Sequence, residues 1–217
     1  MVLDVVKYGD PVLRKKGAKI ETITPEITQF IADMFDTMKA ARGVGLAAQQ
    51  VGRALQLTVI DVRGLRDRPS LLWLDGQPAE AEAFMPLVLI NPQIHPVGPR
   101  VTGPEGCLSF PEIYGEIERL AEVEVTAQNE RGEAFSFKAG GLLARAIQHE
   151  VDHLNGILFI DRMSSDVRAE VKDEVDYLQA ETKAKLNRLG AGDHHKLWPS
   201  PEFNLRIPGL AASSPRA

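Results

Sequence analysis

A long amphipathic pattern lies near the N-terminus of the chain. Its apolar residues recur every three or four positions, as on the buried face of a helix: Ile27, Phe30, Ile31, Met34 and Met38. Thr24 can accept a hydrogen bond from the first turn, and Pro25 suits the first helical position. Gly43 fits just beyond the last turn. The pattern therefore predicts a helix over residues 25–41.

Shorter apolar segments follow and predict strands. Residues 55–62 and 86–94 are rich in branched apolar side chains, and each segment is expected to form a strand. Residues 122–138 alternate between apolar and polar positions on both sides of a polar turn, which predicts a hairpin. Residues 63–85 are mixed and contain glycine and proline, so a loop excursion is expected there. Residues 157–160 are candidates for a short buried strand.

Two further helices are predicted in the second half of the chain. Residues 141–154 show an apolar face and end at an Asn-Gly pair, and residues 165–189 form a longer charged pattern with an apolar stripe. Helices and strands do not alternate strictly, which favours an α+β fold over a wound parallel sheet. From residue 190 onward the chain is rich in Gly, Pro and Ser. We therefore expect a catalytic or binding domain over 1–189 and an irregular tail over 190–217.

Composition narrows the class of protein. The chain has 217 residues, of which 44% are hydrophobic and 25% charged, which suits one domain with a substantial core. The net charge of −5 argues against nucleic-acid binding, and no apolar run approaches the roughly 20 residues of a membrane helix. No secretory signal is visible. Cys107 is the single cysteine, so no internal disulfide can form, and a cytoplasmic location is expected.

The predicted helix over residues 141–154 carries a candidate metal site. His149 and His153 are four residues apart, so both imidazoles project from one face and can hold one metal ion. Glu150 stands beside the first histidine and could take a proton from a water molecule that the metal activates. The alternative is an amphipathic helix with two surface histidines. Both rings border the apolar face, however, and polar groups near a core need partners.

The third metal ligand cannot be assigned from this motif alone. An extended form of the motif would place a histidine where this chain has Phe159, which cannot bind a metal. Glu170 and Glu174 on the next predicted helix are available, although charged helix faces are usually only solvated. Cys107 lies in a segment rich in Gly and Pro, residues 103–112, which is expected to be irregular and to display the thiol. One cysteine and two histidines would leave a coordination position open, as in catalytic sites.

A glycine-rich segment, GVGLAAQQVG, is a further candidate. Gly43 and Gly45 permit close backbone approach, and Ala47 keeps the surface small enough for another chain to lie against it. Gln50 offers an amide donor. The segment lacks the Lys-Ser/Thr ending of a phosphate-binding loop. Taken alone, it would be interpreted as a glycine loop that ends a helix.

Three segments taken together resemble the peptide deformylase family. They are G-V-G-L-A-A-Q-Q at 43–50, E-G-C-L-S at 105–109 and H-E-V-D-H at 149–153, in the order and at the separations of that family. K-Y-G-D-P-V-L-R near the N-terminus and the Asn-Pro pair at 91–92 also look like the family. The resemblance covers about residues 3–165, and three linked motifs are far more specific than the histidine motif alone.

The resemblance implies an activity and a cofactor. Members of the family remove the formyl group from N-formylmethionine on newly made bacterial polypeptides and release formate. At the matching positions, the metal ligands would be Cys107, His149 and His153. The metal would be Fe²⁺, with Zn²⁺, Ni²⁺ or Co²⁺ able to occupy the site. The fold implied is α+β, with antiparallel sheets packed around the central metal-binding helix and a C-terminal helix.

The resemblance also implies roles for other residues. Glu150 would act as general base and then as general acid. Gln50 and the backbone N–H of Leu108 would stabilise the developing oxyanion. Val44 and Gly45 would line the substrate strand and the methionine pocket. The expected partners are N-formylmethionyl peptides, with neither a nucleic acid nor a membrane.

Several features of this chain require separate expectations. Arg145 is expected to pair with Asp152 rather than with substrate, and Arg119 is a second candidate partner for Asp152. The 63–85 excursion is expected to be a surface loop, the alternative being a segment that edges the peptide cleft. The segment 164–189 carries six acids and five bases, a net charge of −1, which gives little support to docking on ribosomal RNA.

Two rival functions remain open from the sequence. A zinc peptidase would use Glu170 or Glu174 as its third ligand in place of Cys107. A metal-stabilised binding module would have no turnover but would lose its fold when a chelator removes the metal.

Overall fold

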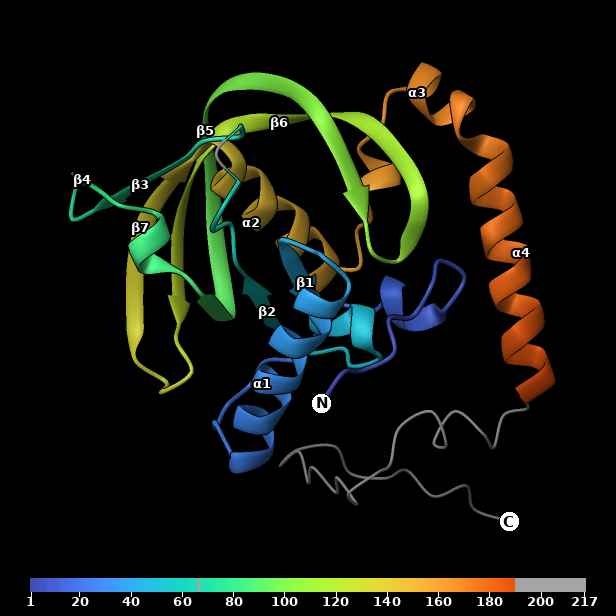
Figure 1. Ribbon diagram of the computed structural model, residues 1–217, viewed down its shortest axis with the longest axis horizontal. Helices are drawn as coiled ribbons and strands as arrows, with labels where there is room; N and C mark the ends of the chain where they lie inside the picture. Colours follow the sequence, from blue (N-terminus) through green and yellow to red (C-terminus); the bar gives the residue numbers. More distant parts are fainter. Residues whose placement is uncertain (66, 190–217) are drawn as a thin grey trace, which may run out of the picture.

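The computed structural model describes residues 1–65 and 67–189, and within these residues seven strands form one antiparallel sheet (Figure 1). The strand order is β1-β2-β5-β6-β7-β3-β4. The strands are β1 (Gly45–Ala47), β2 (Leu57–Ile60), β3 (Ser70–Leu74), β4 (Gln77–Ala79), β5 (Leu87–Cys107), β6 (Phe110–Gln128) and β7 (Ala134–Gly140). The predicted α+β class with antiparallel pairing is confirmed.

Helices pack against the curved sheet. The α-helices are α1 (Pro25–Ala40), α2 (Gly141–Leu154), α3 (Ser165–Glu170) and α4 (Lys172–Leu189), and the 3-10 turns are η1 (Pro11–Arg14), η2 (Ala48–Val51), η3 (Glu82–Phe84) and η4 (Phe159–Asp161). The far ends of β5 and β6 arch over α2, which lies at the centre, while α4 lies on the side away from β3 and β4 (Figure 1). None of the described helices is long and apolar enough to cross a membrane.

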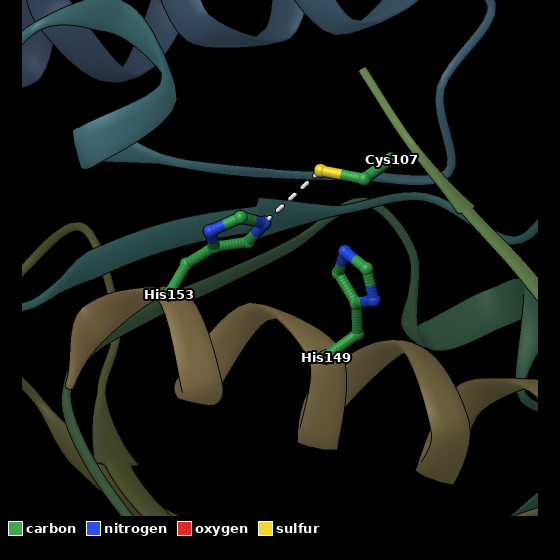
Figure 2. Close-up of side chains that lie close together, drawn as sticks. All are labelled: Cys107, His149 and His153. Carbon is green, nitrogen blue, oxygen red and sulfur yellow. Dashed lines mark hydrogen bonds between the residues drawn. The ribbon is translucent and has the colours of Figure 1, made fainter. Parts of the chain in front are cut away.

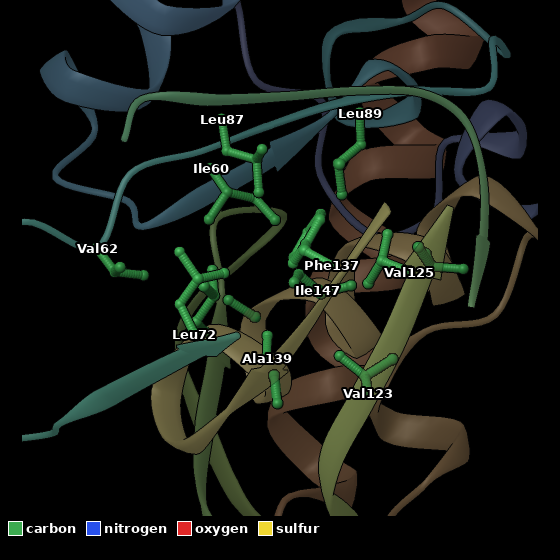
Figure 3. Close-up of a cluster of buried hydrophobic side chains, with 14 of the residues drawn as sticks. Ile60, Val62, Leu72, Leu87, Leu89, Val123, Val125, Phe137, Ala139 and Ile147 are labelled. Atoms are coloured by element: carbon green, nitrogen blue, oxygen red, sulfur yellow. The ribbon is translucent and has the colours of Figure 1, made fainter. Parts of the chain in front are cut away.

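The central helix α2 is held by the main apolar cluster. Ile147 of α2 lies among inward-facing residues of the surrounding strands (Figure 3), including Leu87, Leu89, Val125 and Phe137. Strand side chains alternate between the two faces of a sheet, so every second residue of these strands can reach the helix. Since α2 is buried along most of its length, the side chains that it presents toward the β5–β6 arch are held in fixed positions.

Two of the three helices predicted from apolar spacing are confirmed. The predicted helix over 25–41 is α1, and the Thr24 hydroxyl accepts a hydrogen bond from the Ile27 N–H at 3.4 Å. The predicted helix over 141–154 is α2. The predicted strand over 55–62 contains β2, and the predicted strand over 86–94 overlaps the start of β5. The predicted hairpin over 122–138 is formed by β6 and β7.

The segment over residues 103–112 was expected to be irregular, and this expectation is wrong. Its residues belong to the long β5–β6 hairpin, in which Cys107 pairs with Phe110 around a two-residue turn. Strand β2 pairs with β5 only as far as Ile90 of β5, so among the described strands only β6 pairs with the part of β5 that leads to Cys107.

Three other expectations need correction. The 63–85 excursion contains the β3–β4 hairpin, whose turn residues Asp75 and Gly76 have φ values of 49° and 76°, as a two-residue hairpin turn requires. Residues 157–160 do not form a strand but lead into η4, where the Asp161 carboxylate accepts from the Leu158 N–H at 2.8 Å. The 165–189 helix is interrupted at Val171, which separates α3 from α4. The expected tail over 190–217 lies outside the described residues.

Candidate metal centre

Three candidate ligands converge in the space between the β5–β6 hairpin and α2. The ligand atoms of Cys107, His149 and His153 all lie within 4.8 Å of one another. The Cys107 sulfur is 3.3 Å from Nε2 of His153, and Figure 2 shows all three side chains pointing toward one another. One thiolate and two imidazoles at these separations fit a divalent metal ion, with a coordination position left for substrate or solvent.

Local structure explains this convergence. Cys107 is the last residue of β5, beside the tight turn that begins β6. His149 and His153 lie one turn apart on α2, and their ring centroids are 5.1 Å apart. Leu143, Ile147 and the other apolar residues of α2 occupy its core side, which leaves the two imidazoles facing the hairpin. The site therefore requires the hairpin and the helix to pack correctly.

A buried carboxylate orients the first histidine. His149 Nδ1 donates to Glu105 Oε2 at 2.9 Å, so that Nε2 is left for the metal. Arg119 donates to both oxygens of Glu105, at 2.6 and 2.9 Å. Burial alone would raise the pKa of Glu105, but its hydrogen bonds from His149 and Arg119 outweigh this effect and hold the pKa well below the usual value. Glu105 is therefore a fixed negative charge behind the site.

The electrostatics of the two imidazoles fit a cation between them. Burial keeps the pKa of His153 well below its normal value, so this ring is neutral and able to bind metal. Burial also lowers the pKa of His149, but hydrogen bonds to Cys107 and Glu105 outweigh it and raise the pKa well above normal. The anionic groups that favour a proton on His149 would equally favour a dication.

Glu150 has the properties of an acid–base group. Its side chain is buried, only 4% exposed, yet it lines the cleft of about 700 Å³ that leads to the candidate ligands. Burial raises the pKa of Glu150 to about 7, and a nearby dication would lower it again. Its Oε2 has no hydrogen-bond partner within the part of the chain that the structure describes. An unpartnered buried carboxylate oxygen is free to accept a proton.

The other proposed site residues lie around the same cleft. Gln50 is held by a hydrogen bond from the Ala47 N–H to its Oε1, at 2.8 Å, which turns its amide group toward Cys107; Nε2 and the sulfur are 3.4 Å apart. Leu108, in the hairpin turn, and Val44, beside β1, are both half-buried and line the cleft. The structure thus brings together residues from three separate motifs.

The competing third ligands are not near the two histidines. Glu170 on α3 and Glu174 on α4 are both exposed, and neither belongs to the cluster of ligand atoms. Phe159 packs beside the His149 ring, with centroids 6.1 Å apart. From the 63–85 segment, Arg68 lines the cleft, whereas the β3–β4 hairpin extends the sheet beside β7.

The predicted ion pair between Arg145 and Asp152 is wrong. Arg145 donates to Glu105 at 2.8 Å, while Asp152 is paired with Arg119 at 2.9 Å and with Arg162 at 2.6 Å. Arg145 and Asp152 are two helical turns apart, and a helical side chain leans toward the N-terminus, which takes Arg145 away from Asp152. The second candidate, Arg119, is the one confirmed.

The sequence analysis gave Glu105 and Arg119 no role in the site. A signal for Glu105 exists: it precedes Cys107 by two residues, so that within a strand both side chains point to the same side. That signal was hidden because the segment was expected to be irregular. Arg119 gave no comparable signal, since its contact with Glu105 arises from the register of the hairpin.

We expect Glu105→Gln to lower the free energy of unfolding of the metal-free protein by about 3–5 kcal/mol, because it breaks a buried charge pair. The two side chains of this ion pair, Glu105 and Arg119, are each only 5% exposed. Glu118→Gln is the matched control, since its ion pair with Arg100 is exposed and is expected to contribute less than about 1 kcal/mol. Urea unfolding measures both, and equal midpoints for the two variants would contradict the prediction.

Gly45 lies against the carboxylate of Glu150. A Cβ atom at Gly45 would lie 2.3 Å from Oε1 of Glu150 and 2.8 Å from its Cδ. We expect Gly45→Ala to displace this carboxylate and to lower kcat by about 100-fold, as misplacement by about 1 Å can do. Metal content should not change, because no candidate ligand is touched. Measured kcat and metal content test this, and an unchanged kcat would show that Glu150 can move without cost.

The chain is similar in sequence to peptide deformylases along most of its length. The family model described as Polypeptide deformylase matches residues 2–169. The chain is 46% identical over 194 residues to a peptide deformylase of Opitutus terrae, covering 86% of this chain and 99% of that protein. It is 44% identical to a peptide deformylase of Methylacidiphilum infernorum over 82% of this chain and 94% of the relative.

Solved structures give the same result. The crystal structure of plant peptide deformylase PDF1B superposes with a TM-score of 0.73 at 36% identity, covering 85% of this chain and 93% of the plant protein. A peptide deformylase from Synechococcus elongatus in complex with actinonin gives a TM-score of 0.68 at 41% identity, over 81% of this chain and 85% of that chain.

Proposed function

The chain belongs to the peptide deformylase family, and from this premise we propose that it hydrolyses the formyl group from the N-terminal formylmethionine of newly made polypeptides and releases formate. The observation that carries the proposal is the meeting of Cys107, His149 and His153 beside a buried carboxylate, Glu150. We propose residues 1–189 as the catalytic unit and 190–217 as a separate tail. The cytoplasm, where such polypeptides are made, is the proposed location.

Cys107, His149 and His153 are the proposed ligands of a divalent metal ion, with Fe²⁺ as the native ion and Zn²⁺, Ni²⁺ or Co²⁺ able to occupy the site. A bound dication supplies Lewis acidity, which polarises a carbonyl and makes hydroxide available near neutral pH. The thiolate of Cys107 offsets part of the positive charge. Glu105 holds His149 in the tautomer that leaves Nε2 free to bind.

Glu150 is the proposed general base and general acid. It takes a proton from the attacking water as the water oxygen bonds to the formyl carbon. It then delivers a proton to the departing amine as the C–N bond breaks, so that formate and a free N-terminus are the products. Burial and the unpartnered Oε2 leave this carboxylate able to hold a proton inside the cleft, and the bound dication lowers its pKa from the metal-free value, so that it can also release the proton.

Gln50 and Leu108 are the proposed oxyanion donors. The amide group of Gln50 faces the site, and the backbone N–H of Leu108 lies in the adjacent hairpin turn. Negative charge develops on the formyl oxygen during attack, and the loss of one such donor typically costs roughly 3–4 kcal/mol.

Val44 and Gly45 are the proposed substrate-binding residues. Among the strands that the structure describes, β1 pairs with β2 alone and so lies at the edge of the sheet, and both residues line the cleft. An extended peptide can add to such an edge through main-chain hydrogen bonds. The formylated peptide is the proposed partner, and the net charge of −1 over 164–189 gives no separate reason to invoke RNA.

Formate release from a formyl-methionyl tripeptide tests the proposed function. The protein is loaded anaerobically with Fe²⁺ or with Zn²⁺, and the acetyl-methionyl tripeptide serves as the control substrate. We expect formate from the formyl substrate, a faster rate with Fe²⁺, and no cleavage of the control. A fully metal-loaded protein without turnover would instead favour a binding module. Equal rates with both metals would contradict only the preference for iron.

A further inference from the structure

The N-terminal segment over residues 6–8 joins the two proposed oxyanion donors. The Val6 N–H donates to the Gln50 carbonyl at 2.9 Å, and the Tyr8 N–H donates to the Ser109 carbonyl at 2.9 Å. Between them, Lys7 Nζ donates to the Leu108 carbonyl at 2.9 Å. This short segment therefore spans from the element that carries Gln50 to the hairpin turn that carries Leu108.

Of these three hydrogen bonds, only the one from Lys7 is donated by a side chain. It is half-buried and lines the cleft, and its ammonium group forms no ion pair with a carboxylate within the described part of the chain. Burying a cation without a carboxylate partner costs free energy, so the contact that its ammonium group makes with the Leu108 carbonyl needs an explanation. Its single hydrogen-bond acceptor among the described residues is the Leu108 carbonyl.

The fold of the segment does not depend on Lys7. The hydrogen bonds of Val6 and Tyr8 are made by the backbone, and the Tyr8 ring stacks on Phe110 with centroids 4.7 Å apart. A substitution of the Lys7 side chain leaves all three of these contacts in place. The effect of the Leu108 contact can therefore be measured by itself.

We propose that Lys7 is a positioning residue, whose ammonium group holds the Leu108 carbonyl and so fixes the orientation of the hairpin turn that presents the Leu108 N–H. This inference rests on the proposed function. The turn has only two residues, Leu108 and Ser109, between the paired residues Cys107 and Phe110. The Leu108 N–H and the Leu108 carbonyl lie in the two planar peptide units on either side of the Leu108 Cα. Only the φ and ψ angles of Leu108 relate these two planes, so holding the carbonyl limits the directions in which the N–H can point.

Other roles for Lys7 predict different results. If the ammonium contacted substrate, its removal would raise KM. If it acted mainly on the charge of Cys107, its removal would change metal affinity. A positioning role affects the transition state selectively, so kcat falls while KM and metal affinity stay unchanged.

The test compares Lys7→Met, Lys7→Arg and the control Lys16→Met, in which an exposed lysine of the same region is changed. We expect Lys7→Met to lower kcat by about 10- to 100-fold, since a donor is misplaced rather than removed. Lys7→Arg keeps a donor and should recover most of the loss. Amide hydrogen exchange at Leu108 and Ser109 should be faster in Lys7→Met than in the other two proteins.

An unchanged kcat in Lys7→Met, or a change confined to KM or to metal affinity, would overturn the positioning role. Failure of the arginine variant to recover activity together with unchanged exchange in the turn would also overturn it. If the unsubstituted protein releases no formate although fully loaded with metal, the proposed function fails instead. The exchange measurement then still reports whether Lys7 holds the turn.

Discussion

A Glu150→Gln variant is expected to retain its metal and its fold but to lose about 10²- to 10⁴-fold in kcat, the usual contribution of a positioned acid–base group. Glutamine has the same size and can occupy the space between Gly45 and the candidate metal ligands. It cannot take a proton from water or return one to the leaving amine. Formate release under saturating substrate measures the change.

Stability separates loss of catalysis from loss of fold. Burial raises the pKa of Glu150 to about 7, so its ionised form is disfavoured in the folded state relative to the unfolded state. The carboxylate therefore destabilises the metal-free fold progressively as pH rises above about 4.5, the ordinary value of a glutamate. At neutral pH we expect the metal-free Glu150→Gln variant to unfold at an equal or higher urea concentration than the unsubstituted protein.

The matched control is Glu174→Gln, because Glu174 is an exposed glutamate on α4. Its kcat is expected to equal that of the unsubstituted protein. A Glu150→Gln variant whose kcat lies within about tenfold of the control would fall below the range of a general base, and the proton transfers would then have to be assigned to another group.

Features encoded within a few residues were predictable from the sequence. The spacing of Ile27, Phe30 and Met34 predicts α1, and His149 with His153 predicts one metal-binding face, because helical periodicity is a local property. The α+β class followed from the order of such elements. An Asp-Gly pair at Asp75 and Gly76 is a local signal for a hairpin turn, but the sequence analysis predicted a loop there because Gly and Pro residues surround it.

Features that depend on register between distant segments were not predictable in the same way. Arg119 reaches Glu105 because β5 and β6 pair with a particular offset, and shifts in that register occur along the hairpin. A one-residue slip would turn a side chain to the opposite face of the sheet. Lys7 meets Leu108 only because the N-terminal segment crosses beside the turn. Cys107 was predicted as the third metal ligand because the segment around it resembles the family and because few other ligands were available.

Replacing Cys107 with alanine is expected to have the largest effect on metal binding. The structure assembles three candidate ligand atoms within 4.8 Å, and only one of them is a sulfur, which a metal ion would bind as a thiolate. Its removal leaves the two imidazoles as the only candidate ligands in this cluster, so affinity should fall by more than the 10- to 100-fold typical of losing a supporting residue behind a ligand. Metal content after dialysis and formate release should therefore fall together.

This variant also separates the two hydrolase mechanisms that share the histidine motif. A zinc peptidase with Glu170 or Glu174 as third ligand would retain its metal without Cys107, whereas both glutamates are exposed and lie outside the cluster in this structure. We therefore expect Glu170→Gln and Glu174→Gln to bind metal normally and Cys107→Ala to bind it poorly, with all three folded by circular dichroism. If Cys107→Ala retained all of its metal, Cys107 would not be a metal ligand. The metal site proposed for deformylase chemistry in this cleft would then have no third protein ligand.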